Sequence, residues 1–159
     1  MEHRPAVPAD AAAITDHHHR CWVSAFTHLL PEGAIDGLRS EVMLETWHGR
    51  LASGSGHSTV VAVDAGRVVG HTSVRRNEIV TLYVHPDEQG RGIGRRLLGV
   101  AEGIVSDAGH DEAELRTVVG NDPAIGLYRS AGWTVTEEIV RSEDYGMTYD
   151  EQVLRKRLR

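Results

Sequence analysis

The stretch Gln89-Gly90-Arg91-Gly92-Ile93-Gly94 decides the fold, because it joins a strand-like run, Glu78–Val84, to a helix expected from about Gly92 to Ala108. The first backbone amides of a helix have no partner within it, and the helix dipole adds partial positive charge. The glycines leave the backbone open to close approach by a ligand. Positive charge is added by Arg91, Arg95 and Arg96. The junction therefore predicts a phosphate-binding turn.

The spacing of this turn excludes two common nucleotide loops. A P-loop needs Gly-Lys-Ser/Thr after its first glycine, and the turn contains no lysine. The dinucleotide fingerprint G-x-G-x-x-G also fails, because Arg95 and Leu97 stand where its third glycine would be required. The plain alternative is a glycine turn without a ligand, and three glycines beside three arginines argue against it.

Around the junction, the residue pattern predicts one α/β domain that covers residues 1–159, without repeats or a linker. Asp10 and Asp122 are expected to cap helices, and Asp64-Ala65-Gly66 to form a hairpin turn. Gly132 suits the left-handed end of a helix. The expected elements, in order, are strand Arg4–Val7, helices Ala11–Leu29 and Leu38–Leu51 (the latter with Val42, Leu44, Trp47 and Leu51 inward), strands Thr59–Val63, Arg67–Val74 and Glu78–Val84, helix Gly92–Ala108, strand Glu114–Val119, a helix opened by Asp122-Pro123, and strands Trp133–Val140 and Met147–Leu158.

Composition narrows the class of protein further. The chain has 159 residues and a formal net charge of -6, which gives no general attraction to nucleic acid. Cys21 is the only cysteine, so no internal disulfide can form. The N-terminus lacks the apolar region of a signal peptide, and no apolar run is long enough to cross a bilayer. We expect a cytoplasmic protein that binds neither nucleic acid nor membrane.

Two signatures resemble the GNAT (Gcn5-related N-acetyltransferase) superfamily. The first is Q/R-x-x-G-x-G/A after a strand, which Gln89–Gly94 fits, with Leu82-Tyr83-Val84-His85-Pro86 before it and Arg95-Arg96-Leu97-Leu98 after it. The second is an asparagine after the next strand and then a helix with a tyrosine, which Asn121 and Tyr128 fit. The opening Arg4-Pro5-Ala6 and the pair Trp22 and Phe26 are also similar, so the resemblance spans nearly the whole chain.

The resemblance implies a fold and a cofactor. The fold is a mixed, mostly antiparallel sheet flanked by helices, in which Glu78–Val84 and Glu114–Val119 are parallel and splay apart at a cofactor cleft. The cofactor is acetyl-coenzyme A. Its pantetheine arm would pair with the backbone of Leu82, Tyr83 and Val84, an amide near Val84 would polarise the thioester carbonyl, and Asn121 would bond the arm or its loop. Its pyrophosphate would lie on Gln89, Gly90, Arg91, Gly92, Ile93, Gly94 and Arg95.

Two residues are candidates for proton transfer. Tyr128 would donate a proton to the departing thiolate, and the alternative is a packed tyrosine. Glu78 would take the proton of the attacking amine, which at pH 7 is uncharged only about once in two thousand molecules; the alternative is an exposed carboxylate at a strand end. Some family members carry a glutamate five residues before the asparagine, where this chain has Arg116. The base therefore stays open.

The histidines and the early aromatic residues have weaker predictions. His17, His18 and His19 point about 100° apart on a helix, so they are not expected to share a metal. The resemblance implies that some of His17–His19, Trp22 and Phe26 touch the acceptor. The alternative is core packing for Trp22 and Phe26 and solvent exposure for the histidines. Cys21 is expected in the core and His85 on the surface. The basic run Arg155–Arg159 is expected to be a solvated strand end.

The expected reaction is direct acetyl transfer from acetyl-CoA to an amine of a small molecule or a peptide, within one ternary complex. Three alternatives stay open: a non-catalytic acyl-CoA-binding domain, a transferase for another acyl group or a hydroxyl acceptor, and a nucleotide phosphotransferase. The sequence does not identify the acceptor, and a homodimer is compatible with it.

Overall fold

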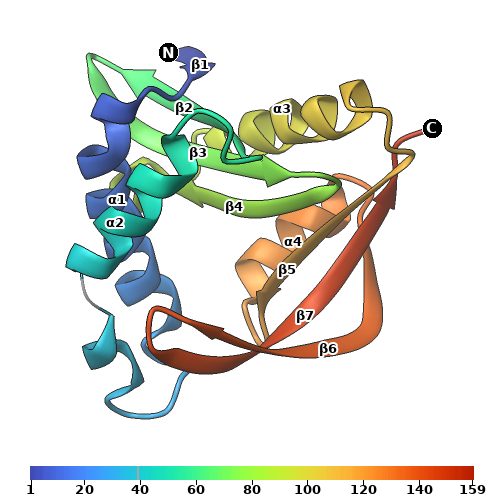
Figure 1. The fold of residues 1–159 in the computed structure, drawn as a ribbon. Helices are drawn as coiled ribbons and strands as arrows, with labels where there is room; N and C mark the ends of the chain where they lie inside the picture. The colour runs from blue at the N-terminus through green and yellow to red at the C-terminus, as the bar shows by residue number, and fades with distance from the viewer. Residues whose placement is uncertain (39) are drawn as a thin grey trace.

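The computed structural model describes residues 1–38 and 40–159, and within them the chain folds around a sheet of seven strands in the order β1-β2-β3-β4-β5-β7-β6 (Figure 1). Neighbouring strands are antiparallel except β4 and β5, which are parallel. The predicted mixed, mostly antiparallel sheet is therefore confirmed. The strands are β1 (Glu2–Pro5), β2 (Ser58–Asp64), β3 (Arg67–Arg75), β4 (Glu78–Val84), β5 (Glu112–Val118), β6 (Thr134–Asp144) and β7 (Met147–Arg157).

Helices cover both faces of the sheet (Figure 1). On one face α1 (Ala11–Phe26) and α2 (Ser40–Leu51) pack on a core that includes Trp22, Trp47 and Val61. On the other face α3 (Ile93–Asp107) and α4 (Asp122–Ser130) pack on a core that includes Leu98 and Leu115. Three 3-10 turns, Pro8–Asp10, Ala34–Gly37 and Pro86–Glu88, join these elements.

The parallel pair β4 and β5 is short, as predicted. Only Glu78 with Glu114 and Ile79 with Leu115 are in register, and beyond them the two strands separate. β5 remains in the sheet because it pairs along its whole length with β7. The second half of β4 therefore has β3 on one side and an open gap on the other.

The hairpin turn predicted at Asp64-Ala65-Gly66 is present, and its left-handed backbone favours glycine. Ala65 and Gly66 both have positive φ, 49° and 76°, which suits the tight turn between β2 and β3. Tyr145 and Gly146 repeat this geometry between β6 and β7, with φ of 51° and 79°. Gly132, with φ of 88°, follows α4 as expected.

Side-chain interactions move several element boundaries from their predicted places. β1 ends at Pro5, because the Val7 amide donates to the Asp10 carboxylate (2.8 Å) instead of joining the ladder. Asp10 holds the N-cap position of α1 as predicted, but its carboxylate binds Arg4 and the Val7 amide and makes no cap bond to α1. Asp122 is the first residue of α4, and Asn121 holds the cap position without a side-chain bond.

Three expectations for the first pair of helices are corrected. α1 ends at Phe26 rather than Leu29. In α2, Met43 and Trp47 are fully buried, because residues four apart share one helix face, whereas Val42 points to solvent and is 45% exposed. Leu38 lies outside the helix, which starts at Ser40 after the undescribed residue 39.

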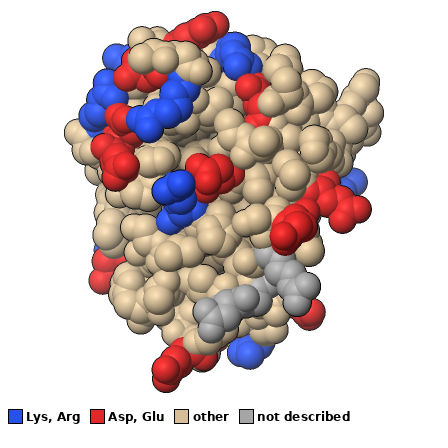
Figure 2. Space-filling view, turned by 90° about the vertical axis from the view of Figure 1, so that its left-hand side faces the viewer, with Lys and Arg blue, Asp and Glu red and all other residues tan. Residues whose placement is uncertain are grey.

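The surface over α1 and α2 carries interspersed acidic and basic side chains rather than one large field of a single sign (Figure 2). No helix in the described part of the chain is both long and apolar enough to cross a membrane. Within residues 1–38 and 40–159, no three His, Cys, Asp or Glu side chains are grouped so that they could hold a metal ion.

Buried histidines lie where α1 packs on β3. His17 Nε2 is 2.5 Å from His71 Nδ1, and His18 is within hydrogen-bonding distance of the indole nitrogens of both Trp22 (2.9 Å) and Trp47 (3.1 Å). Burial lowers the pKa of His17 to about 4 and lowers the pKa values of His18 and His71 well below 6.5. All three rings are therefore neutral in the folded protein at pH 7.

We predict that these histidines make folding stability fall with pH between 6.5 and about 4. Their folded pKa values lie below the unfolded value, so the unfolded chain binds the protons first and acid favours unfolding. Each histidine contributes up to about 1.4 kcal/mol per pH unit. Urea unfolding at several pH values gives the slope of the free energy of unfolding against pH. This slope should be shallower for His71→Leu by the contribution of about one proton. The exposed His48→Leu serves as the control, and equal slopes for all three proteins would contradict the prediction.

Candidate active site

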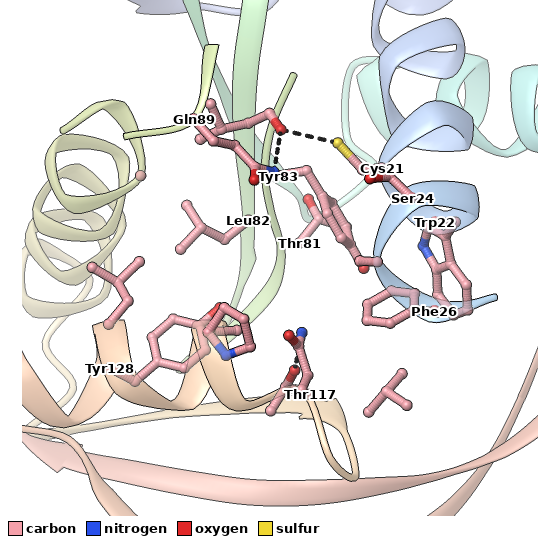
Figure 3. Close-up of a pocket in the computed structure, with 18 of the residues that line it drawn as sticks. Cys21, Trp22, Ser24, Phe26, Thr81, Leu82, Tyr83, Gln89, Thr117 and Tyr128 are labelled. Carbon is pink, nitrogen blue, oxygen red and sulfur yellow. Dashed lines mark hydrogen bonds between the residues drawn. The ribbon is translucent and has the colours of Figure 1, made fainter. Parts of the chain in front are cut away.

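A cleft of about 610 Å³, here called the main cleft, opens where β4 leaves β5 (Figure 3). Its walls are the C-terminal half of α1, the facing strands β4 and β5, and the N-terminal ends of α3 and α4. Both predicted signatures meet here although about 30 residues separate them in the chain. The cleft is long and open, so an extended ligand can lie along it.

The glycine turn forms one end of the main cleft. Gly90 and Gly92 have φ of 82° and 78°, a backbone region that other residues adopt only at a cost. Gly92 thereby turns the chain into α3, whose first amides lie at the cleft wall with Ile93 and Gly94. Unsatisfied amides and the positive end of the helix dipole make this the anion-binding end of the cleft.

The arginines of the turn differ in what they can reach. Arg95 lines the main cleft and donates to Ser130 Oγ at 2.6 Å. Arg91 does not line it, because its guanidinium is bound by Asp64 (3.1 Å) and Glu88. In this structure the Arg91 side chain is therefore paired with two carboxylates, and its predicted part in the ligand site stays a prediction. Arg96 is exposed and does not line the cleft.

The edge of β4 presents free backbone groups to the gap. The His85 amide donates to the Val69 carbonyl at 2.8 Å, on the β3 side. Because backbone groups of a strand alternate in direction, the amides of Leu82 and Val84 face away from β3 and toward the main cleft. The Val84 carbonyl points the same way, accepting from Cys21 Sγ (3.1 Å) and from Gln89 Nε2 (3.4 Å) (Figure 3).

Asn121 and Tyr128 lie on the opposite wall. Tyr128 is 7% exposed and lines the main cleft, and burial raises the pKa of its phenol well above the ordinary value of 10. The phenol is therefore protonated at neutral pH and can act as a hydrogen-bond or proton donor to a group beside it. The Asn121 amide donates to Thr117 Oγ1 at 3.0 Å.

A second hollow of about 200 Å³, here called the side pocket, adjoins the main cleft. The two share six residues, namely Trp22, Val80, Thr81, Tyr83, Arg116 and Glu151. Glu78 lines only the side pocket and Tyr128 lines only the main cleft. The two predicted proton-transfer residues therefore stand on different sides of this junction.

Glu151 on β7 was not predicted. Of the described carboxylates it alone lines both hollows. Ser142 Oγ donates to it at 2.6 Å. Burial raises the pKa of Glu151, opposed by the Ser142 bond and the Arg116 charge and reinforced by the nearby carboxylate of Glu78. The sequence did hold one indication of this position. Side chains alternate along a strand, so Glu151 lies on the same inward face of β7 as Tyr149 and Val153.

The early aromatic residues pack in the core, as one of their two predictions had it, and their contact with an acceptor stays a prediction. Trp22 and Phe26 are each 3% exposed, and their ring centroids are 4.7 Å apart. Both also line the main cleft. His18 lines the side pocket, while His17 and His19 line neither hollow. His85 is half-buried, and its ring accepts from the Asp87 amide at 3.2 Å.

Comparison with known proteins gives one family. The model of the acetyltransferase (GNAT) family matches residues 11–133. A mycothiol acetyltransferase of Clavibacter sepedonicus is 36% identical over 81 residues, 48% of this chain and 27% of that protein. An aminoglycoside N(6')-acetyltransferase type 1 of Stenotrophomonas maltophilia is 29% identical over 150 residues, 86% of this chain and 88% of that protein. The chain thus spans about a quarter of the first relative and most of the second.

The solved structures agree with this family. The yncA protein of Salmonella typhimurium, solved with its cofactor acetyl-CoA, has a TM-score of 0.73 and 25% identity. The match covers 100% of this chain and 94% of that one.

We predict that the Cys21 thiol is unreactive in the folded protein. Burial raises its pKa to about 12 from 9.0, which lowers the thiolate fraction about a thousandfold. Alkylation by iodoacetamide at pH 7.5 should be at least about a hundredfold slower in the native protein than in urea. Mass spectrometry of Cys21→Ser gives the background. Similar native and denatured rates would show that the thiol is exposed and ionised.

Proposed function

This chain belongs to the acetyltransferase (GNAT) family, and from that premise we propose that it transfers the acetyl group of acetyl-CoA directly to an amine. The observation that carries the proposal is the main cleft itself. It combines an anion-binding helix end, the unpaired edge of a strand and a neutral phenol along one continuous surface. We further propose that residues 1–159 act as one domain in the cytoplasm, as a monomer or a homodimer.

In this proposal the cofactor lies along the main cleft. Its pyrophosphate accepts from the backbone of the turn Gln89–Arg95 and from the Arg95 guanidinium. Its pantetheine arm takes the place of the missing neighbour strand and bonds the free amides of Leu82 and Val84. Asn121, held by Thr117, contacts the arm from the opposite wall.

The reaction follows from the surroundings of the thioester. The neutral amine attacks the carbonyl carbon, and the oxyanion that forms accepts from an amide of the β4 edge. The tetrahedral intermediate collapses by breaking the carbon–sulfur bond. Tyr128 gives its proton to the departing thiolate, which leaves as coenzyme A. The phenol is protonated at neutral pH, so its proton is available to the thiolate.

The proton of the amine goes to a pair of carboxylates in this proposal. Glu151 stands at the junction and receives it, and Glu78, which shares the side pocket, keeps the basicity of Glu151 high through like-charge repulsion. Direct transfer is supported by Cys21, whose buried, protonated thiol is a poor nucleophile.

We predict that Tyr128→Phe lowers kcat for acetyl transfer by about a hundredfold, the lower range for loss of a general acid. The KM for acetyl-CoA should change little, because phenylalanine keeps the packing of the ring. Thiol release with a panel of amines measures both constants. An unchanged kcat in the variant would remove Tyr128 from the proton transfer.

We also predict that Glu151→Gln removes the enzyme's part of the acidic limb of the pH profile of kcat/KM and leaves only the part due to protonation of the amine substrate. A base is active only when deprotonated, so the wild-type rate falls as pH falls through the raised pKa of Glu151. The variant should lose about a hundredfold or more at neutral pH. Glu78→Gln should keep the limb and shift it to lower pH. An unaltered limb in Glu151→Gln would assign the base elsewhere.

A further inference from the structure

The side pocket has walls of opposite charge. Glu78, Glu143, Asp144 and Glu151 line it together with Arg50 and Arg116. Arg50 closes α2 and lies over the Trp47 ring, 5.1 Å from the ring centroid. Tyr145, at the turn of the β6–β7 hairpin, reaches the same wall. The pocket therefore has cationic and anionic groups within one small volume.

Unpartnered polar atoms gather on this wall. Arg50 Nη1, Thr81 Oγ1 and Tyr145 OH are buried without a hydrogen-bond partner in the described part of the chain, and all three residues line the side pocket. Thr81 is 6% and Tyr145 is 9% exposed. Buried donors left without acceptors are unfavourable, and each calls for a ligand or water that satisfies it.

The two ends of the pocket differ in what they offer. Arg50 and Tyr145 lie close to each other beneath the β6–β7 turn, where Glu143 and Asp144 also line the pocket. At that end Arg50 Nη1 and Tyr145 OH are left without a hydrogen-bond partner in the described part of the chain. Glu151, beside Arg116 and Glu78, presents a carboxylate where the side pocket meets the main cleft. A purely cationic ligand would leave the Arg50 and Tyr145 donors unpaired, and a purely anionic one would find no partner at Glu151. A ligand with both charges satisfies both ends.

We propose that the side pocket binds a small acceptor that carries both an amine and a carboxylate, of the amino-acid class. Its amine lies at Glu151, next to the thioester in the main cleft, and its carboxylate accepts from Arg50 and Tyr145. This assignment rests on the proposed acetyl transfer and specifies its acceptor. A volume of about 200 Å³ holds roughly six or seven water molecules, which suits one small molecule.

The assignment is tested by the ratio of kcat/KM for an amino acid to kcat/KM for the matching carboxamide. Each L-amino acid of a panel is compared with its own α-carboxamide, which keeps the amine and removes the negative charge; kanamycin represents polycationic acceptors. Thiol release gives kcat/KM for each. The wild-type protein should prefer the free acid by about tenfold or more, since a polar site discriminates strongly against a ligand that lacks the charge it binds. Equal or better rates with carboxamides or kanamycin would overturn the proposal.

Variants connect the preference to Arg50. Arg50→Gln should lower the ratio of acid to carboxamide toward one, and Arg50→Lys, which keeps the charge, should restore part of it. A variant that is partly unfolded loses both rates alike, so the ratio is unaffected by misfolding. Arg20→Gln, an exposed arginine paired with Asp16 on α1, is the matched control and should keep the wild-type ratio. An unchanged ratio in Arg50→Gln would overturn the carboxylate site.

Binding separates failure of this inference from failure of acetyl transfer. Tryptophan fluorescence of the CoA-bound protein, with Trp22 at the junction, follows the binding of the same acids and carboxamides without turnover. Tighter binding of the acids that is lost in Arg50→Gln supports the pocket even when no amine releases thiol. Turnover of amines without preference for the acids leaves acetyl transfer standing and rejects the acceptor class.

Discussion

The separation of β4 from β5 beyond Ile79 and Leu115 is the constraint on which the rest of the structure depends. Strands that stop pairing leave amides and carbonyls that need another partner. The gap does not collapse, because β5 is held by seven residue pairs with β7 and β4 by β3. The glycine turn at the end of β4 then aims the amides of α3 into the same opening. Both hollows are consequences of this one interruption of the ladder.

The parts of the molecule that local chemistry determines could be predicted from the sequence. The strand Glu78–Val84, the turn that follows it and the parallel, splayed pair were expected and are present. Positive φ at Gly90 and Gly92 and the helix start after them are requirements of a few consecutive residues. Some element boundaries were predicted wrongly because a side chain elsewhere in the chain determines them. The Val7 amide, for example, donates to the Asp10 carboxylate, and β1 is shorter than predicted.

The side pocket could not be predicted, because no short stretch of sequence contains it. Arg50 comes from the end of α2, Tyr145 from a hairpin turn and Glu151 from the middle of β7. Each is unremarkable in its own segment, and the bond between Ser142 and Glu151 exists only because β6 and β7 pair. Sequence patterns identify the cofactor machinery that the family shares, whereas the shape of the side pocket depends on how the β6–β7 hairpin packs against α1 and α2.

Beneath that wall the protein keeps polar groups that stability alone does not favour. A neutral imidazole has one lone pair, so His18 can accept from only one of its two indole neighbours at a time. Among the described residues His71 Nε2 finds no partner although it is buried, at a cost of about 1–3 kcal/mol. His18 lines the side pocket and stacks on Tyr83, with ring centroids 4.6 Å apart. Because Tyr83 lines both the main cleft and the side pocket, this ring pair stands between the two hollows, and a change in either hollow reaches the same aromatic contact.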